Sequence, residues 1–224
     1  MSVARRRAAL VAKWTIGAAL LASVPIAPRI LGGAGRRQGV PDELRAVVLA
    51  HPAKIDAVQL VDHRGEQVTS DDLFRGGWSF VFLGFASCPN VCPATLAQLA
   101  TIKQSFARQF PDAQRPRYVF VTVDPRRDTP DRLASYLAAF DRDFIGATGD
   151  PAQIAALSDG LTAFHRTRGA QSADDYGIVH SGEIYLFDPA GRVYARFTPP
   201  LNPQAIPRQL LSLMALYAAE AGRS

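Results

Sequence analysis

The stretch WSFVFLGFASCPNVCPATLAQLATIKQSFARQF, residues 78–110, reads as a strand, a turn and a helix in succession. Its first nine residues are apolar almost throughout, which is typical of a central strand covered on both faces. From Pro93 onward, apolar side chains recur at helical spacing, and Pro93 suits the first helical position because its missing N–H would have no partner there. Cys88 and Cys92, the only cysteines of the chain, stand at the turn between the two elements.

Two further strand–helix units follow this one. RYVFVTVDP, residues 117–125, predicts a second buried strand, and Thr129 and Pro130 predict the cap and first residue of the next helix. FIGATG, residues 144–149, predicts a short strand, and the apolar periodicity after it predicts a helix over residues 151–165.

Hairpin patterns lie on both sides of these units. DAVQLVDHRGEQVT, residues 56–69, predicts two short strands around an Arg64-Gly65 turn. SGEIYLFDPAGRVYARF, residues 181–197, predicts an antiparallel hairpin with a Pro-Ala-Gly turn, and an amphipathic helix is expected over residues 203–221. Parallel units followed by a hairpin and a helix indicate an α/β fold, a thioredoxin-like sheet with flanking helices.

The positive charge of the chain is concentrated at its N-terminus. The 224 residues carry a formal net charge of +5, yet seven basic residues and no acidic residue precede residue 38. The rest of the chain has 18 basic and 20 acidic residues, so its net charge is −2. A mildly acidic body gives no electrostatic support to nucleic-acid binding.

The basic leader precedes the apolar run WTIGAALLASVPIAP, residues 14–28, which is the layout of a secretory signal or a membrane anchor. The run is shorter than the roughly 20 residues that a straight spanning helix needs, and cleavage after Ala34 is an alternative. A lipoprotein anchor is excluded because the leader has no cysteine. We expect residues 1–37 to be an uncleaved inner-membrane anchor or signal with its linker, and residues 38–224 to be one exported domain, periplasmic in a bacterium.

The predicted topology brings four distant residues together. The carboxyl ends of parallel strands share one edge of a sheet, so the loop of Cys88 and Cys92 should meet Asp124 there. The first strand of the final hairpin runs the opposite way, so His180, just before it, should arrive at the same edge. We therefore expect these four side chains to converge.

Two sulfurs and one imidazole predict a metal site. We expect the helix N-terminus to lower the pKa of Cys92, and thiolates are the metal-binding form of cysteine. Such soft ligands suit copper(I) or zinc, and magnesium or calcium poorly. A structural zinc site normally has four protein ligands, and only three converge here, which favours copper.

Other interpretations of these residues remain open. The cysteines could form a structural disulfide or a redox-active pair. Asp124 either stabilises its turn or orients His180. Surface or structural roles are expected for His51, His63 and His165, and His165 is the only one of them to consider as a fourth ligand. Arg126 and Arg127 are expected to be solvated next to Asp128, or alternatively to meet an acidic partner.

The chain resembles the SCO/SenC family of copper-binding proteins over about residues 56–210. Three segments carry the resemblance by their order and spacing: FLGFASCPNVCPATL, VFVTVDPRRDTPDRL and VHSGEIYLFDPAGRV. It implies a thioredoxin-like fold, copper ligands at Cys88, Cys92 and His180, and an acidic position at Asp124.

The resemblance also implies a function. It favours a copper metallochaperone that supports assembly of the dinuclear copper centre of cytochrome c oxidase. The alternative is a thiol-disulfide oxidoreductase in which Cys88 and Cys92 reduce the cysteines of the oxidase copper subunit, so an enzymatic activity stays open. Expected partners are that subunit, a copper donor, a thiol reductant and the inner membrane.

Overall fold

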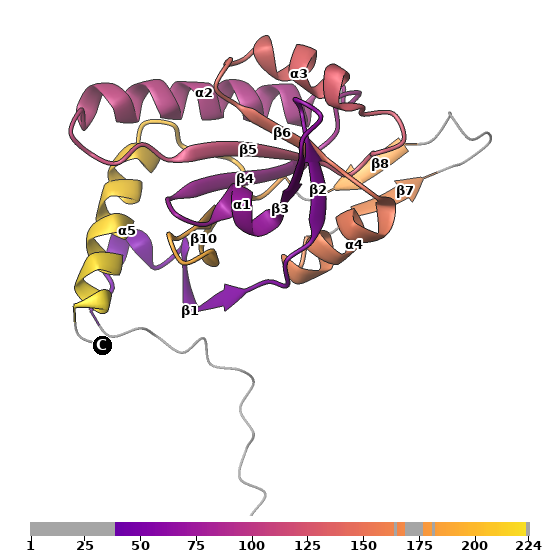
Figure 1. Cartoon of the computed structure of the whole chain (residues 1–224). Helices are drawn as coiled ribbons and strands as arrows, with labels where there is room; N and C mark the ends of the chain where they lie inside the picture. The colour runs from indigo at the N-terminus through magenta and orange to yellow at the C-terminus, as the bar shows by residue number, and fades with distance from the viewer. Residues whose placement is uncertain (1–38, 164, 169–176, 181, 223–224) are drawn as a thin grey trace, which may run out of the picture. The chain divides into compact units, whose positions relative to one another are not determined.

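The computed structural model describes residues 39–163, 165–168, 177–180 and 182–222 (Figure 1). Within these residues, eight strands form one mixed sheet, in the spatial order β1 (Val48–Lys54), β10 (Arg192–Phe197), β9 (Ile184–Phe187), β4 (Ser79–Gly84), β5 (Arg117–Thr122), β6 (Ile145–Thr148), β2 (Gln59–Asp62) and β3 (Gln67–Thr69). A separate two-stranded ribbon joins β7 (His165–Arg168) to β8 (Gly177–His180).

The centre of the sheet has the predicted parallel arrangement. β4 pairs in parallel with β5, and β5 in parallel with β6. All six residues of β4 are buried, as expected for a strand that has neighbours on both sides and helices over both faces. The hairpins β2–β3 and β9–β10 are antiparallel, with Gly191 at a φ of 76° in the second turn. The predicted α/β fold of thioredoxin type is confirmed.

Helices cover both faces of the sheet. They are η1 (Asp42–Leu44, a short 3-10 helix), α1 (Ser70–Phe74), α2 (Val91–Gln109), α3 (Pro130–Ala138), α4 (Pro151–Gly160) and α5 (Ile206–Ala221). α2 and α3 lie over one face and α1 and α4 over the other (Figure 1). α5 packs against α2 and η1.

Two predicted helix boundaries are wrong. α2 begins at Val91, two residues before Pro93, and a proline is tolerated in the first turn because N–H groups there have no partner within the helix. α4 ends at Gly160, and Thr162 follows it with a φ of 53°, which turns the chain away from the helical path. His165 therefore begins strand β7 and does not lie in a helix.

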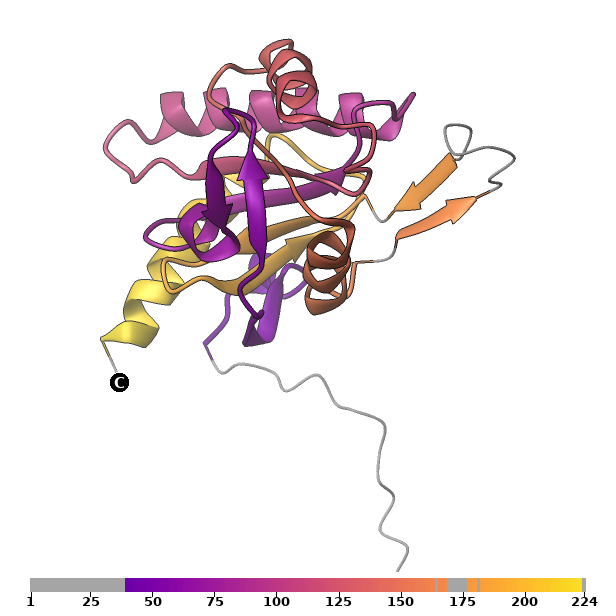
Figure 2. The same ribbon diagram turned by 45° about the vertical axis from the view of Figure 1, so that its right-hand side comes forward.

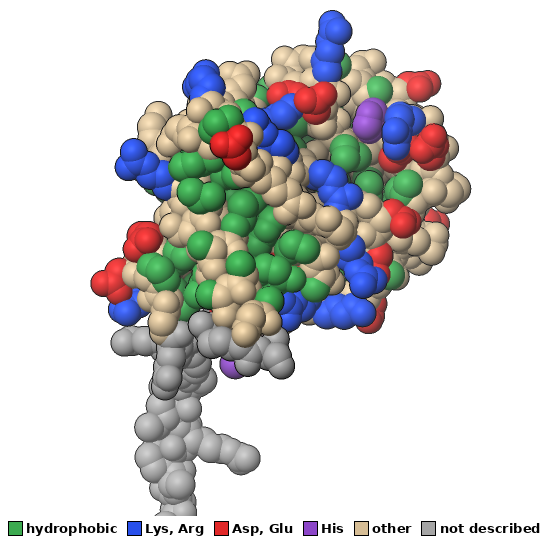
Figure 3. Space-filling model, turned by 60° about the vertical axis from the view of Figure 1, so that its left-hand side comes forward, with side chains coloured by type: hydrophobic (Ala, Val, Ile, Leu, Met, Phe, Trp, Pro, Cys, Tyr) green, Lys and Arg blue, Asp and Glu red, His purple; other side chains and the backbone are tan. Residues whose placement is uncertain are grey.

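The side of the molecule that carries α5 gathers hydrophobic side chains between charged ones (Figure 3). Leu211 of α5 is 37% exposed there, while Leu210 and Leu213 are fully buried against the core. A buried apolar face and an exposed face on the same helix are the amphipathic pattern that the sequence predicted for α5.

The predicted leader, residues 1–37, lies outside the described residues. None of the helices in the described part of the chain is long and apolar enough to cross a membrane.

The end of β4 is packed so closely that Gly84 has no room for a side chain. A Cβ added at Gly84 would lie 2.8 Å from Sγ of Cys92 and 2.7 Å from a ring carbon of Phe120. We expect Gly84→Ala to lower the free energy of unfolding by about 1–3 kcal/mol, because both neighbours are buried and must move. Chemical denaturation measures this change.

Gly222→Ala is the matched control, because the nearest atom to its added Cβ is a carbonyl oxygen at 3.6 Å, an ordinary contact. A stability change no larger in Gly84→Ala than in this control would contradict the tight packing described.

Candidate metal centre

The ends of three strands meet at one edge of the sheet. β4 ends at Gly84, its parallel neighbour β5 ends at Thr122, and β9 begins at Ile184, which pairs with Phe82 of β4. α2 begins at this edge, and the β7–β8 ribbon projects from the body (Figure 2). The topology thus gathers the loops that carry the predicted site residues.

The two cysteines interact through the start of α2. The backbone N–H of Cys92 donates a hydrogen bond to Sγ of Cys88, with an N···S distance of 3.3 Å. Asn90, the N-cap residue, makes no capping hydrogen bond with its side chain. The Cys88 sulfur thus accepts from one of the helix N–H groups that have no partner within the helix. Neither cysteine is in a disulfide bond; Cys88 is half-buried and Cys92 is fully buried.

The expected lowering of the Cys92 pKa is wrong. Burial raises the pKa of the Cys92 thiol, and a hydrogen bond from the backbone of Phe85 only partly opposes this effect. The neighbouring Cys88 and the Asp128 carboxylate raise the pKa further. The N–H of Cys92 in the first turn of α2 points at the sulfur of Cys88. The pKa of the Cys92 thiol is therefore determined mainly by its burial away from water.

His180 is the last residue of β8, and the backbone register places it opposite His165. Gly182 follows two residues later, and a Cβ added there would lie 3.5 Å from Cγ1 of Val91. Val91 is the residue immediately before Cys92. The backbone at Gly182 therefore runs beside the start of α2, next to Cys92.

Asp124 lies at the same edge and is fully buried. Its Oδ2 forms an ion pair with Nε of Arg127 at 2.5 Å, and its backbone N–H donates to Oγ1 of Thr122. Its carbonyl oxygen accepts from the N–H groups of Arg127 and Asp128. These contacts agree with the turn-stabilising alternative for Asp124. Arg127 is paired with this carboxylate, so of the two expectations for this arginine the ion pair, and not solvation alone, is observed.

Asp128 lies at the same edge, and the sequence analysis assigned it no role there. Its buried Oδ2 accepts hydrogen bonds from the N–H of Ala86, at 2.9 Å, and from Oγ1 of Thr122, at 2.6 Å. Burial raises the pKa of this carboxyl above its ordinary value, and the two hydrogen bonds only partly oppose this effect. Its spacing from Asp124 gave no signal, since the sequence alone does not tell a buried carboxylate from a solvated one.

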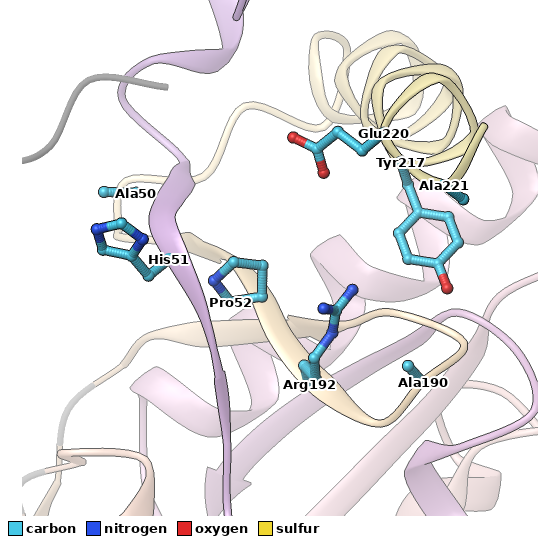
Figure 4. A pocket seen from close by; sticks show the side chains of 8 residues that line it. All are labelled: Ala50, His51, Pro52, Ala190, Arg192, Tyr217, Glu220 and Ala221. Carbon is cyan, nitrogen blue, oxygen red and sulfur yellow. The ribbon is translucent and has the colours of Figure 1, made fainter. Parts of the chain in front are cut away.

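The two remaining histidines lie away from this edge. Nδ1 of His63 accepts a hydrogen bond from the N–H of Gly146, which confirms a structural role. His51 is exposed on β1 and borders a pocket of about 480 Å³ that Arg192 of β10 and Tyr217 of α5 also line (Figure 4). This pocket contains neither cysteine, so it does not belong to the predicted site.

Among the side chains that the structure describes, no three His, Cys, Asp or Glu are grouped so as to hold a metal ion. That set includes Cys88, Cys92 and Asp124, whereas His180 is described by its backbone. The convergence of both sulfurs with the imidazole stays a prediction.

Comparison with known proteins adds independent information. The family model SCO1/SenC matches residues 50–215. An SCO2-like protein of Rickettsia prowazekii is 37% identical over 149 residues, which cover 66% of this chain and 71% of the relative.

Solved structures of similar fold include several with copper bound. ScoI of Bradyrhizobium japonicum is 31% identical, with a TM-score of 0.62, over 73% of this chain and 99% of its own. ScoI of Arabidopsis thaliana is 25% identical, with a TM-score of 0.68, over 74% of this chain and 100% of its own.

The unequal burial of the sulfurs predicts unequal reactivity. At pH 8, we expect iodoacetamide to alkylate Cys88 of the reduced native protein at least about tenfold faster than Cys92, since each pH unit by which a thiol pKa exceeds the pH costs about a factor of ten in thiolate. Peptide mass spectrometry measures both rates, and the difference should vanish in denaturant. Faster labelling of Cys92 in the native protein would contradict this assignment.

Proposed function

Because this chain belongs to the SCO1/SenC family, we propose that it is a copper metallochaperone with Cys88, Cys92 and His180 as ligands. It binds one copper ion and supports assembly of the dinuclear copper centre of cytochrome c oxidase. The observation that carries the proposal is the pair of reduced cysteines that are joined by a hydrogen bond in the first turn of α2, beside the chain segment that follows His180.

The donor set favours copper. Thiolate sulfur and imidazole nitrogen are soft or borderline ligands, which suit copper(I), and three protein ligands are fewer than structural zinc requires. The two related proteins with copper bound support the same metal.

The burial of Cys92 makes copper uptake a proton-coupled process. Its raised pKa keeps this thiol protonated near neutral pH, so binding must displace the proton. The site must also be reduced, because a disulfide between the cysteines would remove both sulfur ligands. A thiol reductant and a copper donor are therefore proposed partners, together with the copper-binding subunit of the oxidase.

The sequence of the leader supports the proposed location. Seven basic residues and an apolar run fit an inner-membrane anchor with residues 38–224 as one domain in the periplasm, or a cleaved signal that releases this domain. Either arrangement puts the cysteines in an oxidising space, where maintaining them reduced matters.

The second candidate function is reduction of a partner disulfide, which the asymmetric cysteine pair favours. The Cys88 thiolate would attack one sulfur of the partner disulfide, break that S–S bond and form a mixed disulfide. Cys92 would then pass its proton to the partner thiolate released in the first step, attack Sγ of Cys88 and release the second partner sulfur, which takes up a proton from water to complete the dithiol. Two electrons pass to the partner, and the chain is left with a Cys88–Cys92 disulfide that an external thiol must reduce.

Copper titration tests the leading proposal. We expect the reduced full chain to take up one copper(I) per molecule, measured by competition with a chromophoric chelator. His180→Ala should weaken copper retention by more than the roughly 10–100-fold that loss of an outer partner of a ligand costs. His51→Ala is the control, because this exposed histidine lies on β1. Equal affinity of the His180 variant and wild type would rule out the assigned coordination.

Trapping tests the second candidate. With an oxidised peptide that carries two cysteines, we expect metal-free Cys92→Ser to accumulate a mixed disulfide through Cys88, because the resolving thiol is missing. Cys88→Ser should accumulate much less, since Cys92 is buried. Non-reducing electrophoresis and mass spectrometry measure both yields, and equal yields would argue against Cys88 as the attacking thiol.

A further inference from the structure

A buried carboxylate holds the segment that leads into Cys88. The Asp128 side chain is fully buried, and its Oδ2 accepts from the backbone N–H of Ala86 and from the hydroxyl of Thr122. Ala86 lies two residues before Cys88, and Thr122 is the last residue of β5. The carboxylate therefore joins the cysteine loop to the central sheet.

A second attachment comes from the same helical turn. Oδ1 of Asp128 lies 3.6 Å from Nε of Arg132, which is within ion-pair distance but too long for a hydrogen bond. An Nη atom of Arg132 donates to Oγ of Ser87 at 2.6 Å. Ser87 directly precedes Cys88, so two consecutive loop residues are held by Asp128 and by its ion-pair partner.

The length of the loop makes these attachments consequential. Three residues separate the end of β4 at Gly84 from Cys88, and the N–H of Cys88 donates to the carbonyl of Phe85. A segment this short has little freedom once Ala86 and Ser87 are held, so the position of the Cys88 sulfur relative to Cys92 follows from them.

We propose that Asp128 is a positioning residue for the cysteine pair: with Arg132, it holds the loop so that Cys88 stays close to Cys92, as copper binding and disulfide formation both require. This inference rests on the proposed function for its copper readout. In this proposal Asp128 acts through the loop backbone and is not a metal ligand.

The chain supplies a matched control carboxylate. Asp188 is also fully buried, accepts backbone N–H bonds from Ala190 and Arg192, and forms an ion pair with the arginine four residues later. It lies in the β9–β10 turn, after the end of β9 that is remote from the cysteine loop. Asp188→Asn therefore removes an equivalent charge without touching that loop.

The experiment compares Asp128→Asn and Asp188→Asn in the reduced full chain. We expect Asp128→Asn to weaken copper(I) binding about 10–100-fold, the usual cost of losing an outer partner, and Asp188→Asn to retain the wild-type affinity. Arg132→Gln alters a side chain that is 46% exposed, so it should fold, and it should weaken binding in the same direction but less.

A metal-free readout separates this inference from the proposed function. Loosening the loop lowers the effective concentration of one thiol at the other, so the equilibrium constant for forming the Cys88–Cys92 disulfide against glutathione should fall in Asp128→Asn and Arg132→Gln, but not in Asp188→Asn. If wild type takes up no copper, the proposed function fails, and this equilibrium still decides the role of Asp128.

Two results would overturn the inference. One is wild-type copper affinity and exchange equilibrium in Arg132→Gln and in folded Asp128→Asn. The other is a loss in Asp188→Asn as large as in Asp128→Asn, which would reflect a general loss of stability rather than loop positioning.

Discussion

The pairing of β4 with its two neighbours determines where the chemistry of this protein can occur. β4 runs parallel to β5 and antiparallel to β9 in continuous register, so the chain leaves β4 and β5 and enters β9 at one edge of the sheet. Every residue of β4 is buried, which leaves its end as the first place where polar side chains can reach solvent. The cysteine loop, the turn after β5 and the segment after β8 are all attached at this edge.

The sulfur of Cys88 takes the place of a side-chain cap at the start of α2. Asn90 provides no side-chain acceptor at the start of α2, and the Cys88 sulfur accepts the N–H of Cys92 instead. A ligand or a disulfide bond at Cys88 would thus act on the first turn of a helix that also packs against α5. The state of the sulfurs and the order of this turn are physically linked, because an unsatisfied N–H in a partly buried helix end is costly.

Long apolar segments made most of the fold predictable, whereas short polar segments did not. β4 and β5 are recognisable because their residues are apolar almost throughout, and the β9–β10 turn because it contains Pro189 and Gly191. β7 was not predicted because the apolar periodicity of α4 continues in the sequence past the end of this helix. Only the backbone conformation of Thr162 shows that the helix has ended. β1, with the sequence VLAHPAK, has neither alternation nor an apolar run long enough to predict a strand.

For the site, the order of strands and helices along the sequence predicted which loops meet. It could not predict which side chains in those loops are buried. Asp124 and Asp128 stand four residues apart in VDPRRD, and both carboxylates turn out to be buried and compensated, by Arg127 and Arg132 respectively. Compensated carboxylates attract a cation weakly, because the nearby guanidinium opposes the field. The edge therefore offers little electrostatic preference for hard ions such as magnesium or calcium, so recognition of the proposed metal would rest on the sulfurs. Sulfur ligands favour a soft metal, in agreement with the proposed copper site.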